Sequence, residues 1–330
     1  MPTYYLGIDV AKQTLDVVLL LDPESLKKRQ KTVPNTPAGY QVLVAWYQHQ
    51  TGTTPEACQV ILEATGPYHE AVAWALHEAG FPVSVVNPKV IKDFAKGLGI
   101  KAKNDGLDAL ILARFGYLIK PARWQPPPPE YRRLTVLLRR LEALETDRQR
   151  EFNRLEKARV SQPTDADVVA SLERAVQFLE AEQERVLALI DEHINQYPEL
   201  GQDRYYLLSI PGIGPVLSVL RVALLQHGQR FHSAAQLVSY LGVIPTEHQS
   251  GTSVHEKPHL SKTGPARLRG KLYMAACVAI RHNPDVRAFY DRLLAKGKSK
   301  MAALGAAMRK LAQICVGVIK NQTTYQPPVA

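Results

Sequence analysis

Cysteine is scarce in this sequence, and its placement excludes two ways of holding a fold together. The chain has 3 cysteines in 330 residues, Cys58, Cys277 and Cys315, at wide and irregular spacing. A disulfide framework uses an even number of cysteines, and a zinc site uses Cys or His ligands in short paired motifs. We therefore expect reduced, packed thiols rather than disulfides or a zinc site.

Long apolar runs are also lacking. The most apolar uninterrupted run is Val17 to Leu21, whereas a helix needs about 20 apolar residues to cross a bilayer. The N-terminal sequence leads into a strand pattern, without the basic and apolar segments of a signal peptide. The sequence therefore predicts a cytoplasmic protein with no membrane partner.

Acidic residues are outnumbered by basic ones. Lys and Arg number 41 against 31 Asp and Glu, which gives a net charge of +10. A positive field of this size favours polyanions such as nucleic acid. Charge alone leaves a merely basic protein open, so the choice depends on motifs. The hydrophobic fraction is 45%, as in an ordinary soluble protein, and the length suffices for two domains.

Residues 1 to about 120 alternate strand and helix signals. β-rich runs at Tyr4–Val10 and Leu15–Leu21, joined by a short polar turn, predict a hairpin. Three strands followed by alternating helix and strand are typical of an RNase H-like mixed sheet. The first strand has no Gly-rich phosphate loop after it, which argues against a Rossmann domain. The further elements are predicted as a strand near Lys28–Val33, a helix at Ala38–His49, a strand at Cys58–Leu62, a helix at His69–Ala79, a strand at Pro82–Val86, and helices at Pro88–Lys96 and Asp105–Ile119.

The proline run Pro126–Pro129 marks a domain boundary, because consecutive prolines stiffen the chain as polyproline II. Two long helices are predicted after it, interrupted near Gln162-Pro163, each with one narrow apolar stripe between charged flanks. So slim a stripe predicts a helical hairpin, or a coiled coil with another subunit, and hence dimerisation. The first stripe is Leu134, Leu137, Leu141 and Leu144, and the second is Leu172, Leu179, Val186 and Leu189.

The predicted fold class is therefore α/β plus all-α, in four segments. Residues 1–125 form an RNase H-like mixed-sheet domain, and residues 126–200 the proline linker and the coiled-coil helices. Residues 201–322 form a helical domain with a helix-hairpin-helix-like element. Residues 323–330, which include two prolines, are predicted to be a disordered tail.

Four carboxylates stand at element ends. Asp9 closes the first strand, Glu63 closes the fourth, and Asp105 and Asp108 share a face at the start of a helix. If the two strands are neighbours, the acids converge and repel one another. A pair of Mg²⁺ ions removes that repulsion, because hard cations prefer carboxylate oxygens, and it can catalyse phosphodiester cleavage. Each acid also has a structural alternative: a strand end at Asp9, an ion pair with a lysine at Glu63, or a helix cap at Asp105.

Candidate nucleic-acid contacts lie in three places. Gly212 and Gly214 stand in Ser209–Pro215, a turn that looks like a helix-hairpin-helix element, where glycines bring N–H groups close to a phosphate. A Pro-Gly turn that merely joins two helices is the alternative. Cationic residues form the other two groups, with a solvated basic face as the alternative. They are Lys101 and Lys103 before the Asp pair, and Lys262, Arg267, Arg269 and Lys271 after a polar loop.

Five short motifs, taken in order, resemble one insertion-sequence transposase family. They are Gly-Ile-Asp-Val-Ala-Lys at 7–12, Glu-Ala-Thr-Gly at 63–66, Asn-Asp-Gly-Leu-Asp-Ala at 104–109, Ile-Pro-Gly-Ile-Gly at 210–214 and Ser-Gly-Thr-Ser-Val at 250–254. The family has an N-terminal RuvC-like DEDD domain and a C-terminal serine-containing transposase domain, and its members are known as bridge-RNA-guided recombinases. The similarity runs nearly end to end, as far as Met-Arg-Lys-Leu-Ala at 308–312.

The resemblance implies a role for five residues. Asp9, Glu63, Asp105 and Asp108 match the family's Mg²⁺-binding acids, and Ser250 matches the nucleophile that attacks a DNA phosphate and holds the cut strand covalently. The energy of the broken bond is thereby kept for rejoining, without ATP. A structured noncoding guide RNA pairs with target and donor DNA, while the protein mainly holds backbones. A composite site between subunits of a dimer or tetramer, and a place on the nucleoid of a bacterial or archaeal cell, are further expectations of the resemblance.

Two other functions are compatible with parts of the sequence. A Mg²⁺-dependent junction-resolving nuclease would use the four acids and water, and would leave Ser250 and the second domain without a role. A non-catalytic nucleic-acid-binding scaffold, built on the coiled coil and the glycine hairpin, would leave Asp9 and Glu63 unexplained. A recombinase uses both halves of the chain, so the sequence favours a transposase.

Overall fold

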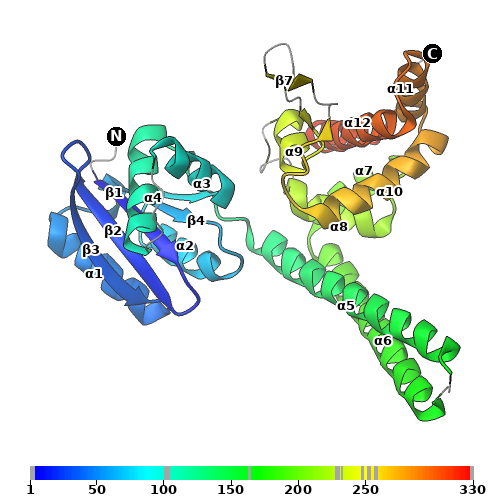
Figure 1. Cartoon of the computed structure of the whole chain (residues 1–330), viewed down its shortest axis with the longest axis horizontal. Helices are drawn as coiled ribbons and strands as arrows, with labels where there is room; N and C mark the ends of the chain where they lie inside the picture. Colours follow the sequence, from blue (N-terminus) through cyan, green and yellow to red (C-terminus); the bar gives the residue numbers. More distant parts are fainter. Residues whose placement is uncertain are drawn as a thin grey trace. The chain divides into compact units, whose positions relative to one another are not determined.

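The computed structural model describes residues 4–99, 105–162, 165–226, 231, 233–246, 249–250, 254–255 and 259–327. The chain forms two compact units, Met1–Pro126 (unit 1) and Pro127–Ala330 (unit 2), as Figure 1 shows. Unit 1 contains a mixed sheet with helices, and unit 2 is mainly helical. The predicted combination of an α/β part with a mainly helical part is therefore confirmed.

The strands described in unit 1 are β1 (Tyr4–Val10), β2 (Thr14–Asp22), β3 (Lys27–Pro34), β4 (Cys58–Glu63) and β5 (Val83–Val86). They form one sheet of order β3-β2-β1-β4-β5. β1 pairs antiparallel with β2, and β2 with β3, whereas the β1–β4 and β4–β5 pairs are parallel. The predicted hairpin and the predicted mixed sheet are therefore confirmed.

The helices described in unit 1 are α1 (Pro37–Thr51), the short 3-10 helix η1 (Pro55–Ala57), α2 (Tyr68–Glu78), α3 (Pro88–Gly97) and α4 (Asp105–Ile119). The starts of α1 and α3 share one signal, a capping side chain followed by proline. Thr36 accepts a hydrogen bond from the Gly39 N–H, and Asn87 accepts one from the Lys89 N–H. These local signals explain why the predicted helix starts lie within a residue or so of the observed ones.

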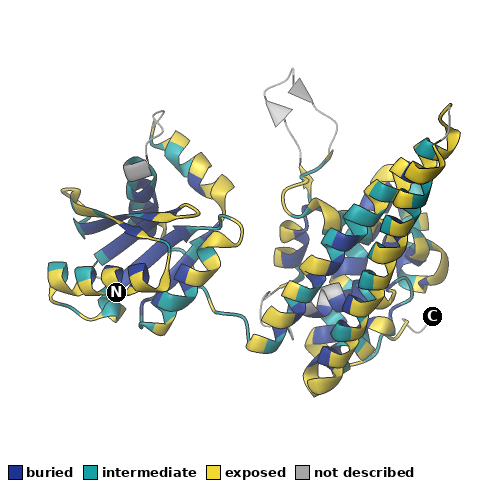
Figure 2. Ribbon diagram, turned by 90° about the horizontal axis from the view of Figure 1, so that it is seen from below, coloured by how far each residue is buried: buried dark blue, intermediate teal, exposed yellow. Residues whose placement is uncertain are grey.

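Side chains of the sheet alternate between two cores on opposite faces, as the period of two along a strand requires. Leu6 and Ile8 of β1 pack with α1 and α2, whereas Tyr5 packs with α3 and α4. Figure 2 shows the strands buried between these helices. Because both faces are covered, β1 and β4 are nearly continuous apolar runs. Their charged residues are Asp9 and Glu63, next to or at a strand end.

Unit 2 begins with two long helices, α5 (Pro129–Val160) and α6 (Ala166–Gln196), which pack against each other. Two ion pairs join the helices, Arg148–Glu180 at 3.4 Å and Arg159–Glu173 at 2.7 Å. The residue number rises on α5 and falls on α6 from one pair to the next, so the helices are antiparallel. The predicted break between the helices and their pairing within the chain are confirmed. α5 starts inside the proline run, because a proline in the first turn needs no N–H partner.

The seam between α5 and α6 follows the predicted stripes only in part. On α5, Leu134, Leu141 and Leu144 are buried as predicted. On α6, however, the predicted Leu172 and Leu189 are only half-buried. Val176 and Ile190, which were not predicted, are buried in the seam instead. A straight helix drifts relative to a seven-residue repeat, so its buried face moves around the helix along its length.

The other elements described in unit 2 are α7 (Pro198–Leu208), α8 (Pro215–Leu225), α9 (Ala234–Tyr240), β6 (Pro245–Thr246), β7 (Gln249–Ser250), β8 (Val254–His255), β9 (His259–Leu260), α10 (Ala266–His282), α11 (Pro284–Ala295) and α12 (Lys300–Asn321). β6 pairs with β9 and β7 with β8, both antiparallel. The sequence predicted a polar loop here instead of strands. Two-residue strands are too short to show alternation in a sequence.

The C-terminal segment corrects one prediction. Residues 323–330 were expected to be disordered, but residues 323–327 are described, and Tyr325 is packed against the helical core. Its hydroxyl donates hydrogen bonds to Asn283 Oδ1 at 3.0 Å and Asp285 Oδ2 at 2.9 Å, and its backbone N–H donates to Ser209 Oγ at 2.7 Å. One aromatic residue with three hydrogen bonds orders a proline-containing tail that composition alone suggests is loose.

We expect Tyr325→Phe to lower the free energy of unfolding by about 1 kcal/mol, because it removes a hydroxyl that bridges Asn283 and Asp285 while keeping the ring. Burial and the Asp285 carboxylate raise the pKa of the Tyr325 hydroxyl to about 12, so it stays protonated at neutral pH. Urea unfolding of the full chain measures the loss. Tyr205→Phe, which changes an exposed tyrosine, is the matched control, and an equal loss in both variants would show that the tail contacts are not stabilising.

α12 is an apolar helix of the unit 2 core. By length and composition alone its 22 residues could cross a membrane, although polar residues interrupt its apolar sequence. However, 61% of the apolar window is buried inside the fold, where Leu311, Cys315 and Ile319 pack in the core. The core helix of a soluble protein passes the same test of length and composition, so α12 is weak evidence for a membrane span.

Candidate active site

Asp9 and Glu63 lie at the same edge of the unit 1 sheet. β1 and β4 are parallel neighbours with Ile8 opposite Leu62, so the residues that follow these two stand side by side. Both acids belong to the face covered by α4, because Tyr5 and Ile61, at even spacing along the same strands, pack into that core. The sequence left the adjacency of the two strands open, and the structure confirms it.

α4 lies directly on β1 at Gly7. A Cβ added to Gly7 would lie 1.9 Å from the Ala109 carbonyl oxygen and 2.5 Å from the Ala113 nitrogen. Any side chain at this position would therefore push the helix off the sheet. Asp108 directly precedes Ala109, so the close approach brings the start of α4 to the edge where Asp9 stands.

The acids at this edge influence one another. Burial raises the pKa of the Glu63 carboxyl above its usual range, and the nearby charges of Asp9 and then Asp108 raise it further. These three predicted acids therefore lie within electrostatic reach of each other. Asp105 opens α4 one turn before Asp108, but its side chain lies outside the described residues. Among the described side chains, no group of three Asp, Glu, His or Cys residues is drawn together closely enough to hold a metal ion.

Asp16 is an acid near this edge that the sequence analysis did not single out. It lies directly opposite Asp9 across the β1–β2 pair, and its carboxylate accepts a hydrogen bond from the Thr32 hydroxyl at 2.6 Å. Residues opposite each other on an antiparallel pair share a face. The signal available in the sequence was the antiparallel hairpin, which places Asp16 across from Asp9 once its register is known.

Glu63→Gln is expected to raise the thermal stability of the chain at pH 7 in EDTA, and to leave it nearly unchanged at pH 4. The raised pKa of Glu63 means that its stabilising contribution is complete below about pH 4.3, the usual value of a free glutamate, and is lost as pH rises through the folded-state pKa. Glutamine stays uncharged throughout that window. Melting temperatures of parent and variant at both pH values measure the effect, and a pH-independent difference would contradict it.

Ser250 lies on β7, where it pairs with Val254 of β8. Its side chain is outside the described residues, as are Lys101 and Lys103. The β6–β9 pair, which joins Pro245 to Leu260, forms the root of this ribbon. The structure thus places the Ser250 backbone on a short two-stranded ribbon that rises from the helical part of unit 2 (Figure 1).

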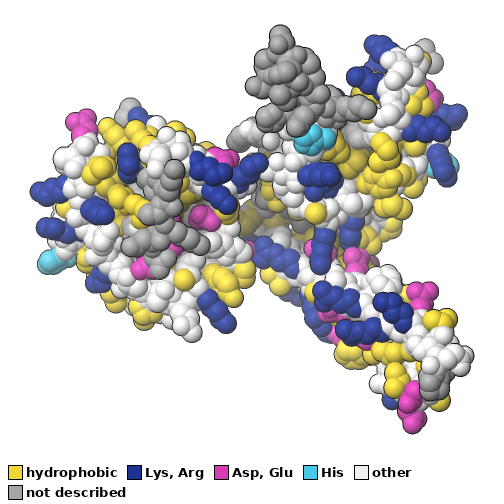
Figure 3. Space-filling view, viewed as in Figure 1, with side chains coloured by type: hydrophobic (Ala, Val, Ile, Leu, Met, Phe, Trp, Pro, Cys, Tyr) yellow, Lys and Arg dark blue, Asp and Glu magenta, His cyan; other side chains and the backbone are white. Residues whose placement is uncertain are grey.

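The four predicted phosphate-contacting cations around α10 differ in their surroundings. Lys262 is exposed. Arg267 lies 4.0 Å from Glu142, and Lys271 lies 2.9 Å from Glu145, so both reach α5. Figure 3 shows such interleaving of Lys and Arg with Asp and Glu along the visible side of α5 and α6. Arg269 donates a hydrogen bond to the Leu241 carbonyl at 3.2 Å. Arg269 and Lys271 therefore have internal structural roles, and Lys262 is the best placed for a ligand.

The two glycines of the α7–α8 turn also differ. Gly212 has a positive φ of 103°, and a Cβ there would lie 2.8 Å from the Ala279 Cβ. Packing against α10 thus explains a glycine at 212 without any DNA. Gly214 is exposed, caps the start of α8, and would have no atom within 4 Å of an added Cβ. Open space in front of a helix start fits the predicted phosphate contact at Gly214 better than at Gly212.

Comparison with known proteins identifies the family. A DEDD transposase profile of IS110 elements matches residues 6–158, and the profile of the IS116/IS110/IS902 transposase family matches residues 204–291. The pilin gene-inverting protein of Moraxella bovis is 34% identical over 98% of both chains, and that of Moraxella lacunata is equally similar. The transposase for insertion sequence element IS1111A of Coxiella burnetii is 24% identical over 97% of this chain and 91% of its own.

The chain belongs to the IS116/IS110/IS902 transposase family. As a member, the transposase is an enzyme that acts on DNA. Its candidate residues are divided between the two matched regions. Residues 6–158 contain the four acids, and residues 204–291 contain Ser250 and the basic group around α10. The DEDD name of the first profile agrees with the residue types at these four positions.

Proposed function

We propose that the transposase cuts and rejoins DNA through a covalent link between Ser250 and a DNA phosphate, assisted by Mg²⁺ held by Asp9, Glu63, Asp105 and Asp108. The observation that carries this proposal is the convergence of acids on one sheet edge, expressed in the raised pKa of Glu63. The strand order β3-β2-β1-β4-β5 supports an RNase H-like, RuvC-like assignment of unit 1. A DNA-inversion reaction, as in the names of the Moraxella relatives, requires the same cutting and rejoining.

The donor set of unit 1 fits a hard divalent cation. Carboxylate oxygens are the ligands that Mg²⁺ prefers, and a cation removes the repulsion that Asp9 and Asp108 impose on Glu63. Asp105 completes the set one helical turn before Asp108. When bound, Mg²⁺ activates an attacking oxygen and stabilises the leaving oxygen of a phosphodiester. The protein's part is to place the carboxylates at one edge of the sheet, and Gly7 contributes because it lets α4 approach β1.

The serine step exchanges one ester for another. The Ser250 hydroxyl loses its proton as its Oγ attacks phosphorus, an Oγ–P bond forms, a DNA P–O bond breaks, and the released DNA oxygen takes up a proton to become a hydroxyl. Because a phosphodiester remains on the protein, a DNA hydroxyl can reverse the step without ATP. A serine hydroxyl is a weak nucleophile unless a base or a metal activates it, which is a reason for the enzyme to combine Ser250 with a metal site.

Partners beyond DNA follow from the family resemblance and from one surface. A structured noncoding RNA pairs with donor and target DNA, so that the protein reads shape and backbone. The α5–α6 hairpin exposes Phe178, Val160 and Val168, with Phe178 63% exposed. These exposed apolar side chains are available for contact with a second copy of the chain, and the proposal includes a dimer or tetramer. Because its substrate is DNA, the proposed location of the enzyme is the nucleoid, in the cytoplasm.

Covalent capture tests the proposal. The full chain is incubated with Mg²⁺, the RNA transcribed from the flank of its element and end-labelled donor DNA, and is then denatured. A protein–DNA adduct that requires both Mg²⁺ and the RNA is the expected result. Cleavage without an adduct would identify a junction-resolving nuclease that uses water. Tight binding with neither cleavage nor adduct would identify a nucleic-acid-binding scaffold.

A further inference from the structure

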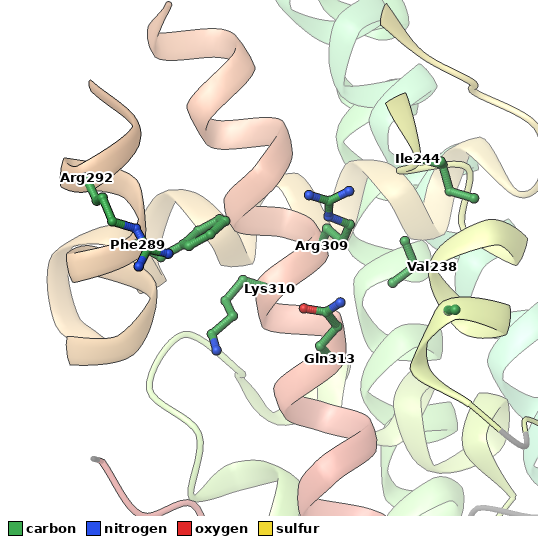
Figure 4. Close-up of a pocket in the computed structure, with 8 residues that line it drawn as sticks. Val238, Ile244, Phe289, Arg292, Arg309, Lys310 and Gln313 are labelled. Carbon is green, nitrogen blue, oxygen red and sulfur yellow. The ribbon is translucent and has the colours of Figure 1, made fainter. Parts of the chain in front are cut away.

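Unit 2 contains a cavity of about 430 Å³ among α9, α11 and α12, shown in Figure 4. Apolar surface comes from Val238, Ile244 and Phe289, and polar groups come mainly from α12. Pockets that hold small organic ligands have a similar size and the same mixture of apolar wall and few polar groups. None of its lining residues belongs to the carboxylate site or to the predicted phosphate contacts.

The cavity is positively charged. Arg292, Arg309 and Lys310 line it, and no acidic residue is among its described lining. Within the described part of the chain, none of these three cations forms an ion pair. Arg309 and Lys310 are half-buried, so the positive field that each contributes to the cavity is only partly screened by water. An anion neutralises this field, and guanidinium and ammonium groups both bind phosphate.

Two further side chains in the cavity indicate that its ligand is a nucleotide, with a base attached to the phosphate, and not a free phosphate ion. Phe289 offers an aromatic face, and the Arg292 guanidinium lies 5.3 Å from the centroid of its ring. Gln313 projects from α12 one turn after Arg309, as Figure 4 shows, and can donate or accept hydrogen bonds. Bases bind proteins by stacking on aromatic rings, while cations hold the adjoining backbone.

The cavity lies at the root of the ribbon that carries Ser250. Ile244 lines the cavity and directly precedes β6. On the facing helix, a Cβ added to Gly305 would lie 3.5 Å from the side chain of Leu260 on β9. Gly305, Arg309 and Gln313 recur every four residues, so one face of α12 meets both the ribbon root and the cavity. Ser250 follows Ile244 by six residues, a span of at most about 20 Å.

We propose that this cavity holds one unpaired nucleotide of the DNA strand that Ser250 attacks, with its phosphate on Arg309 and Lys310 and its base against Phe289. The binding itself rests only on the enzyme's action on DNA, and the link to the attacked strand rests on the proposed role of Ser250. A nucleotide held here positions the strand near the serine without selecting a sequence. Sequence selection is then left to base pairing.

Equilibrium binding in EDTA tests the cavity without any chemistry. The full chain is titrated into fluorescent single-stranded DNA, a duplex of the same sequence and single-stranded RNA over a range of salt concentrations. The double variant Arg309→Ala/Lys310→Ala is expected to bind single-stranded DNA at least tenfold more weakly, and its salt slope to fall by about 0.7 for each phosphate that the protein no longer neutralises. Lys296→Ala/Lys298→Ala, which removes the same charge from exposed positions, is the matched control and is expected to change less.

The aromatic contact distinguishes a nucleotide pocket from a basic surface. Phe289→Leu should weaken single-stranded DNA binding about tenfold while leaving duplex binding unchanged, because a paired base cannot stack on the ring. Equal losses for single strand and duplex would overturn the nucleotide assignment. Loss confined to RNA would assign the cavity to the guide instead of DNA. Equal effects of the cavity and control double variants would show that the cavity is not a site.

Ser250→Ala separates this inference from the proposed function. It should bind single-stranded DNA like the parent, because the substitution leaves the cavity residues Arg309, Lys310 and Phe289 unchanged. If the parent forms no covalent adduct but the cavity variants still lose binding selectively, the serine mechanism fails and the cavity stands. Melting temperatures of all variants, measured beforehand, identify any loss that results from unfolding.

Discussion

Ser250→Ala removes the covalent protein–DNA adduct and lowers strand joining by at least about a thousandfold, since loss of a nucleophile leaves only the contributions of binding and electrostatic stabilisation. DNA affinity and thermal stability should stay at the level of the parent enzyme, because the substitution removes one hydroxyl from a two-residue strand. The measurement is denaturing electrophoresis of labelled DNA after reaction with Mg²⁺ and RNA, with the adduct and the free cut strand quantified separately.

Ser253→Ala is the matched control for this prediction. Ser253 belongs to the same Ser-Gly-Thr-Ser-Val motif, so the change removes the same group three residues away. The adduct should persist in this variant. If it persisted in Ser250→Ala and disappeared in Ser253→Ala, the nucleophile would be assigned to the wrong serine of the motif. If both variants formed it, neither hydroxyl would be the attacking group.

Most of unit 1 could be predicted from the sequence because its signals are local. The β1–β2 hairpin and the strand β4 are short apolar runs between polar turns, and α4 begins at Asp105, the predicted residue. Two acids at strand ends indicated the candidate site. What local pattern could not supply was the β1–β4 adjacency, which depends on a crossover, and the Asp9–Asp16 register.

Unit 2 was harder to predict because its decisive contacts join residues far apart in the sequence. Tyr325 is ordered by Asp285 and Ser209, which no local window contains. The cavity likewise combines Ile244, Phe289 and Arg309, each of which is unremarkable in its own segment. In the sequence its cations are only part of a general positive charge, and the fold alone shows that no acidic residue is among the described residues that line the cavity.

Asp9→Ala is expected to lower the rates of both DNA cleavage and adduct formation by about a thousandfold or more. DNA binding in EDTA should be retained. The reason is that Asp9 supplies one of the carboxylates proposed to hold Mg²⁺, and cleavage depends on that ion. Burial is the main reason why the pKa of Glu63 is raised, and the same change removes Asp9, whose charge raises that pKa more than the charge of Asp108 does. The variant should therefore melt no lower than the parent in EDTA at pH 7, which separates lost chemistry from lost folding.

Asp16→Asn provides the comparison, because Asp16 lies opposite Asp9 on β2 but is not among the four proposed ligands. Its rates of cleavage and adduct formation should stay within about tenfold of those of the parent. Removing a group that only hydrogen-bonds to a metal ligand lowers activity by about tenfold at the least, and more in other cases. A second arm measures the rise in melting temperature with added Mg²⁺, which should be present in the parent and in Asp16→Asn and absent in Asp9→Ala. If Asp9→Ala kept full cleavage and the same response to Mg²⁺, Asp9 would be no ligand, and the carboxylate edge of unit 1 would have to act without it.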